Sequence, residues 1–87
     1  MNDNNQTTKF NFDIDNVNEV RELIKTVYNA LEEKGYNPVS QMTGYILSGD
    51  PTYITSYNNA RSIVMKIERD ELVEEILNHY LKSLKDE

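Results

Sequence analysis

The sequence has 87 residues, a formal net charge of −6 at pH 7 and no cysteine. This length allows one small domain, which we expect over residues 9–87 after a flexible tail at residues 1–8. The absence of cysteine excludes disulfides, thiolate zinc sites and cysteine nucleophiles, and one histidine supplies no ligand set for a metal ion. The negative charge disfavours nucleic acids and anionic membranes as partners. We expect no cofactor and no metal.

The amino-terminal residues are polar up to Thr8, which is a composition typical of a disordered tail. They contain no basic and apolar regions of a signal peptide, and no run of 18 apolar residues occurs that would span a membrane. Together with the lack of cysteine, this predicts a cytoplasmic protein. Phe10, Phe12 and Ile14 alternate with polar residues, so we expect residues 9–14 to form an extended arm or a short strand.

The hydrophobic residues that follow recur at helical spacing and predict an all-α fold, a small bundle of four to five short helices. We expect the first helix at residues 17–34, with Asn16 as its N-cap and Gly35 as its left-handed stop. The second is expected at residues 38–48, because Pro38 suits the first position of a helix.

Three further segments are predicted in the rest of the chain. A short helical turn is expected at residues 51–55 and a longer helix at about 57–68. Asp70 is expected to cap the last helix, although the break before it could be absent, which would fuse the two helices. The last helix carries the strongest apolar stripe of the chain: Leu72, Val73, Ile76, Leu77, Tyr80, Leu81 and Leu84.

Gly44 lies inside the predicted helix 38–48, where a glycine costs about 0.5–1 kcal/mol relative to alanine. Such a glycine allows another backbone to approach closely. The surrounding segment, residues 44–51, superficially resembles a phosphate-binding loop. It lacks the Gly-Lys-Ser/Thr ending that places a lysine and a magnesium ligand, so we do not expect a nucleotide site.

The sequence offers little catalytic equipment. Most acidic residues fall on helix faces opposite the apolar stripes, where a solvated surface explains them. Asp50 precedes Pro51 and is explained as a capping residue. His79 has no second histidine or cysteine to join it, so we expect an exposed side chain and not a ligand. We therefore expect a protein that is not an enzyme.

One functional interpretation of the helical segments is a small nucleic-acid-binding regulator. The helical segments 38–48 and 51–68 resemble a helix-turn-helix, whose second helix would contact DNA with amide and basic side chains. The candidate residues are Asn58, Asn59, Arg61, Lys66 and Arg69. The net charge of −6 and the absence of a basic arm oppose this alternative.

Four of the six tyrosines fall within a short stretch of the chain. Tyrosine is enriched at interfaces because its ring is buried while its hydroxyl stays in water. A chain of 87 residues makes only a small core, so a homodimer interface is one interpretation, and the wrapping of that core is the other. The residues concerned are Tyr36, Tyr45, Tyr53 and Tyr57.

Three segments together resemble a known family over residues 7–84. They are KGYNPVSQMTGYILSGDPTYI at residues 34–54, YNNAR at residues 57–61 and ERDELVEE at residues 68–75. The chain is thereby similar to the IreB family of small regulatory phosphoproteins from Gram-positive bacteria. The resemblance implies a compact helical homodimer with a flexible amino-terminal tail.

The resemblance also implies phosphorylation of tail threonines by a transmembrane PASTA-type Ser/Thr kinase, opposed by a phosphatase, in cell-envelope stress signalling through an unknown downstream protein. Thr7 matches the family position, whereas Thr8 stands where an aliphatic residue is usual and Asn4 replaces a second family threonine. A phosphate there would be repelled by the acidic body or would dock on a basic spot. Our candidates for the spot are Arg61, Lys66 and Arg69, and the alternative is that they form ordinary surface ion pairs.

Overall fold

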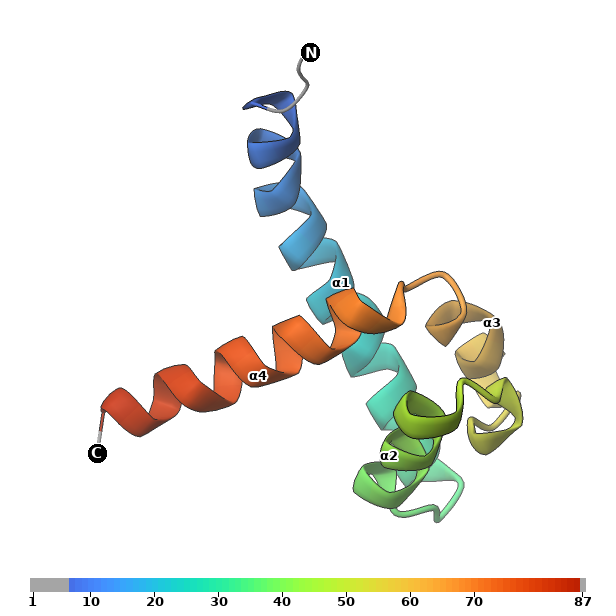
Figure 1. The fold of residues 1–87 in the computed structure, drawn as a ribbon. Helices are drawn as coiled ribbons and strands as arrows, with labels where there is room; N and C mark the ends of the chain where they lie inside the picture. Colours follow the sequence, from blue (N-terminus) through green and yellow to red (C-terminus); the bar gives the residue numbers. More distant parts are fainter. Residues whose placement is uncertain (1–6, 87) are drawn as a thin grey trace.

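The computed structural model describes the backbone of residues 7–86 and the side chains of residues 18–86. Within these residues the chain is entirely helical, which confirms the predicted all-α class (Figure 1). The elements in chain order are α1 (Thr7–Glu33), α2 (Pro38–Ser48), the 3₁₀ turns η1 (Pro51–Tyr53) and η2 (Tyr57–Asn59), α3 (Ala60–Val64) and α4 (Arg69–Lys85).

Helix α1 starts ten residues earlier than the sequence suggested. The predicted extended arm at residues 9–14 is wrong, and Asn16 lies inside the helix instead of capping it. Phe10 and Ile14 are also four residues apart, which is the spacing of one face of a helix. Their pattern therefore agrees with a helix as well as with a strand. A helix satisfies its own backbone hydrogen bonds, whereas a lone strand has no partner. Residues 1–6 of the predicted tail lie outside the described residues. Helix α1 begins at Thr7, the next residue.

The turn between α1 and α2 follows the prediction. Gly35 adopts a φ of +82°, and the Tyr36 amide donates to the Leu31 carbonyl at 2.9 Å, which closes α1 with a Schellman motif. Asn37 then caps α2, because its side chain accepts a hydrogen bond from the Ser40 amide at 3.0 Å. The two helices are therefore joined by a short connection with its backbone groups satisfied.

Asp50 fixes the turn that follows α2. One oxygen of its carboxylate accepts from the Thr52 amide at 3.0 Å and from the Thr52 hydroxyl at 2.7 Å. These hydrogen bonds hold the pKa of Asp50 below its ordinary value. The predicted turn at residues 51–55 is present as the shorter η1. The capping interpretation of Asp50 is confirmed.

The lowered pKa of Asp50 predicts part of the acid sensitivity of the fold. A carboxyl with a depressed pKa stabilises the fold above its unfolded pKa, and this contribution is lost as the pH falls through the folded pKa. Asparagine caps as well as aspartate but does not titrate, so Asp50→Asn should show a shallower loss of stability below about pH 4. Urea unfolding of both proteins between about pH 5 and pH 2 checks this, and parallel curves would contradict it.

The predicted helix at residues 57–68 is interrupted. Asn58 and Asn59 have φ values of +52° and +61°, and they form the end of η2 directly before α3. Asparagine tolerates this left-handed backbone better than most residues do, which explains why the chain turns there. After α3 the helix stops, and Glu68 precedes the first residue of α4. Asp70, predicted as the N-cap, lies instead in the first turn of α4.

The core lies around the second half of α1. Val27, Ala30 and Leu31 are almost fully buried against α2, α3 and the segment between η1 and η2, which contributes Ile54. Helix α4 contributes a single buried residue, Leu72, from its first turn. The remaining core residues are Val20, Tyr45, Ala60, Val64 and Ile67.

The consequence is an open shape. Helix α4 crosses α1 and then extends away from the rest of the chain, and the first half of α1 extends in another direction (Figure 1). The radius of gyration is 14.6 Å, whereas a compact chain of this length has about 12 Å. The compact form implied by the resemblance is therefore not reached by one chain alone.

Candidate functional site

The second half of α4 carries an apolar surface that the chain leaves open. Leu77, Tyr80 and Leu84 follow at intervals of three and four residues, so they share one face of the helix. They are exposed by 48%, 58% and 43%. Ile76 and Leu81, which are also exposed, flank this face. We call these five residues the α4 seam, and an exposed apolar surface of this kind is typical of an interaction site.

A groove between α1, α2 and α4 continues from the α4 seam. Its apolar lining includes Ile24 and Tyr28 from α1, Met42 from α2 and Ile76 from α4. Because Ile76 belongs to both, the seam and the groove form one surface. Hydrogen bonding to Glu32 raises the pKa of the Tyr28 hydroxyl above its ordinary value.

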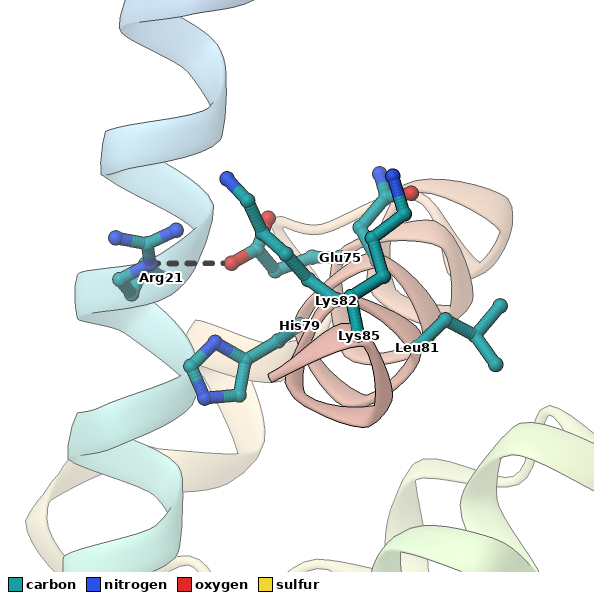
Figure 2. Close-up of a pocket in the computed structure, with 7 residues that line it drawn as sticks. Arg21, Glu75, His79, Leu81, Lys82 and Lys85 are labelled. Carbon is teal, nitrogen blue, oxygen red and sulfur yellow. Dashed lines mark hydrogen bonds and ion pairs between the residues drawn. The ribbon is translucent and has the colours of Figure 1, made fainter. Parts of the chain in front are cut away.

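A second cleft, on the polar side of α4, gathers basic side chains. Arg21 from α1 and His79, Lys82 and Lys85 from α4 line it (Figure 2). The Arg21 Nε donates to the Glu75 Oε2 at 3.1 Å, which joins the two helices. The Glu75 side chain is only 11% exposed, whereas that of Arg21 is 57% exposed. We call Arg21, His79, Lys82 and Lys85 the basic cleft.

The four tyrosines singled out from the sequence have different surroundings. Tyr45 is 5% exposed and belongs to the core, where it wraps the chain's own interior. Tyr36, Tyr53 and Tyr57 remain partly exposed, and their place in a dimer interface stays a prediction. Tyr57 donates to the Glu33 carboxylate at 2.9 Å, and this hydrogen bond raises the pKa of Tyr57.

Two of the three basic residues proposed as a phosphate-docking spot bind backbone carbonyls. The Arg61 Nε donates to the Ile54 carbonyl at 2.9 Å, and the Arg69 Nη1 donates to the Ile46 carbonyl, in the last turn of α2, at 3.0 Å. Carbonyls at the end of a helix lack partners within the helix, so Arg69 satisfies one of them. Lys66 is exposed. The docking of a phosphate at these residues stays a prediction.

The helix that would contact DNA in the nucleic-acid alternative is short. Of the predicted helix 57–68, only Ala60–Val64 is α-helical. Asn58 and Asn59 lie in the left-handed turn before it. These residues thus shape the turn that leads into α3, which is a local structural explanation for their presence.

Thr7 and Thr8, the predicted phosphorylation sites, are the first two residues of α1. Their side chains lie outside the described residues. Their backbone is helical, and the flexibility of the segment stays a prediction. Their modification stays a prediction.

The α4 seam and the basic cleft were not identified from the sequence as sites. The apolar stripe of α4 was visible, but spacing alone does not distinguish a buried stripe from an open one. A usable signal was present, because the strongest stripe of the chain occurs in a chain too short to bury it. The basic cleft combines Arg21 with residues 58 to 64 positions further along the chain, so no local pattern indicates it.

The fold defines a small helical protein that exposes an apolar helix face and a basic cleft. Among the described residues, no three histidine, aspartate or glutamate side chains come together so as to hold a metal ion. No helix in the described part of the chain is long and apolar enough to cross a membrane.

The chain belongs to the IreB family, since the sequence profile described as IreB regulatory phosphoprotein matches residues 5–82. It is 58% identical over 83 residues to a UPF0297 protein of Ruminiclostridium cellulolyticum, covering 95% of this chain and 94% of that protein. It is 62% identical over 79 residues to a UPF0297 protein of Acetivibrio thermocellus, covering 91% and 88%. The resemblance drawn from the sequence is confirmed.

Proposed function

We propose that this protein is a non-enzymatic, cytoplasmic signalling adaptor that is switched by phosphorylation of Thr7 or Thr8. The kinase is a transmembrane PASTA-type Ser/Thr kinase, a phosphatase reverses the modification, and the pathway responds to cell-envelope stress. The observation that carries the proposal is the match to a family of regulatory phosphoproteins over residues 5–82, which include both threonines. The exposed α4 seam supports an adaptor role, because it offers a surface to a downstream protein.

The position of the threonines suits a switch. Both lie in the first turn of α1, which contains no acidic residue. The first turn of a helix opens more easily than its interior, so a kinase can gain access to an extended hydroxyl there. A phosphate adds about −1.5 to −2 charges next to the positive end of the helix dipole. Phosphorylation therefore changes both the charge and the helical order of this end.

Phosphorylation itself is tested with the full-length chain and the host kinase. We expect mass spectrometry to find one phosphate on Thr7 or Thr8, and the double variant Thr7→Ala/Thr8→Ala to take none. Thr26 is a matched control, because its hydroxyl is exposed but lies inside α1 and donates to the Glu22 carbonyl at 3.1 Å. Failure of the kinase to modify either Thr7 or Thr8 would refute the regulatory proposal.

We further propose that the functional form is a homodimer in which the α4 seam is covered. The open shape and the exposed Leu77, Tyr80 and Leu84 support this. A chain of this size rarely supplies a sufficient core by itself, and a partner subunit adds the missing apolar burial.

Sedimentation equilibrium tests the dimer. We expect twice the chain mass of 10.2 kDa. Leu77→Asp/Leu84→Asp should sediment as a monomer, because a carboxylate in an apolar interface has no partner. Leu47→Asp is the control, since Leu47 lies on α2 and is 80% exposed. A Leu77→Asp/Leu84→Asp variant that remains dimeric would contradict the seam as the interface, and dissociation by Tyr36→Asp/Tyr57→Asp instead would place the interface at the tyrosines.

A further inference from the structure

We propose that the basic cleft binds the phosphothreonine of the amino-terminal segment of a second copy of this chain. The inference rests on the proposed phosphorylation and names the place where the phosphate acts. It differs from the docking spot that the sequence suggested, because the structure distributes the free positive charge differently. Three observations support this proposal: two lysines of the cleft have no ion pair among the described residues, the arginines of the other spot are occupied, and α1 holds Thr7 far from its own cleft.

The basic cleft concentrates positive charge in an acidic chain. Lys82 and Lys85 form no ion pair with any side chain of residues 18–86. Arg21, on the facing helix, pairs through its guanidinium Nε with Glu75, which also lines the cleft (Figure 2). The dipole of α4 explains why two lysines lie near its carboxyl-terminal end. It does not explain why an arginine of α1 lines the same cleft. The cleft thus presents cations from two helices to one ligand.

The alternative spot has less to offer a phosphate. Arg61 and Arg69 each donate to a backbone carbonyl, so a phosphate there would compete with these hydrogen bonds. Only Lys66 of that set has no such contact among the described residues. In the basic cleft, Lys82 and Lys85 have no ion pair among the described residues, so they match a phosphate dianion better, because charge-assisted hydrogen bonds to its oxygens are the strong ones.

The occupant comes from another copy of the chain. Thr7 precedes Arg21 by 14 positions on one continuous helix, which separates them by about 21 Å along the axis. A phosphate on Thr7 therefore does not reach the basic cleft of its own chain while α1 stays helical. The segment around Thr7 also carries Asp3, Asp13 and Asp15 against one lysine, so its charge complements the cleft even before phosphorylation.

The test measures binding of a synthetic peptide of residues 1–14 to the full-length, unphosphorylated chain by fluorescence anisotropy. We expect the peptide with phosphothreonine at position 7 to bind about tenfold more tightly than the unmodified peptide, and the difference to shrink at high salt. Lys82→Gln/Lys85→Gln should lose about that factor. Lys34→Gln/Lys66→Gln is the matched control, because it removes the same charge elsewhere and should bind like the parent.

Three results would overturn the proposal. The first is equal binding of the two peptides, and the second is a loss of binding in the Lys34→Gln/Lys66→Gln variant while Lys82→Gln/Lys85→Gln binds normally. The third comes from amide NMR of the full-length chain carrying phosphothreonine at position 7: shifts confined to the first turns of α1 would mean that the phosphate only caps its own helix. The phosphate is introduced synthetically, so these results do not depend on whether the kinase modifies the chain. Modification by the kinase is the separate test of the proposed function.

Discussion

Leu31→Ala is expected to cost a large part of the folding free energy. The Leu31 side chain, on α1, is fully buried in the core, and deletion of a buried leucine side chain typically costs about 2–5 kcal/mol. A domain of this size has about 3–5 kcal/mol to lose, so the loss is comparable to the whole folding free energy. Far-ultraviolet circular dichroism during urea unfolding measures the effect.

The control for this prediction is the same substitution at an exposed leucine. Leu47 is 80% exposed on α2, so Leu47→Ala should change the free energy of unfolding by less than about 0.5 kcal/mol. Comparable losses for Leu31→Ala and Leu47→Ala would contradict the location of the core. The protein concentration must be the same in both measurements, because association adds to the apparent stability.

Gly44→Ala is the second substitution with a large expected effect. A Cβ at this position would lie 2.4 Å from the Cε1 and 2.5 Å from the Cδ1 of Tyr53. The Gln41 side chain donates to the Tyr53 carbonyl at 2.7 Å, which fixes the backbone that carries the ring. Overpacking of this kind costs about 1–3 kcal/mol, and the helical preference of alanine returns about 0.5–1 kcal/mol. We expect a net loss of about 1 kcal/mol.

A double-mutant cycle separates the two effects. In a Tyr53→Ala background the ring is absent, so Gly44→Ala should become stabilising by up to about 1 kcal/mol. If Gly44→Ala changed the free energy of unfolding with the same sign in both backgrounds, the Tyr53 ring would not be the reason for a glycine at this position. The cycle is measured by chemical unfolding, with the slope of the transition as a check on two-state behaviour.

The helical class and several turns could be predicted from the sequence because their causes are local. Gly35 ends α1, Asn37 caps α2 and Asp50 caps η1, and each does so through atoms within a few residues. Gly44 was also recognised as a point of close approach, although the group that approaches is the ring of Tyr53 and not a backbone.

The predictions from the sequence were wrong where a local pattern fits two kinds of secondary structure. Phe10, Phe12 and Ile14 fit period 2, but Phe10 and Ile14 equally fit the stripe of the long α1, and the helix needs no partner. Asn58 and Asn59 fit a helix poorly but do not exclude one, so the left-handed turn was missed.

The candidate surfaces depended on tertiary structure. Tyr45 is buried and Tyr36 is exposed because of how the helices pack around them. The spacing of residues in the sequence does not reveal this packing. The meeting of Arg21 with the end of α4 is likewise a result of the crossing of two helices far apart in the chain.

The single core contact of α4 also has a thermodynamic consequence. Beyond Leu72 the helix continues for about 13 residues without a buried side chain, which is close to the length at which isolated helices are only marginally stable in water. In the proposed homodimer, the partner that covers the α4 seam supplies free energy that keeps this helix ordered, so its order is governed by mass action. The amount of ordered α4 is then expected to rise with protein concentration, which makes the proposed dimer sensitive to the expression level of the chain.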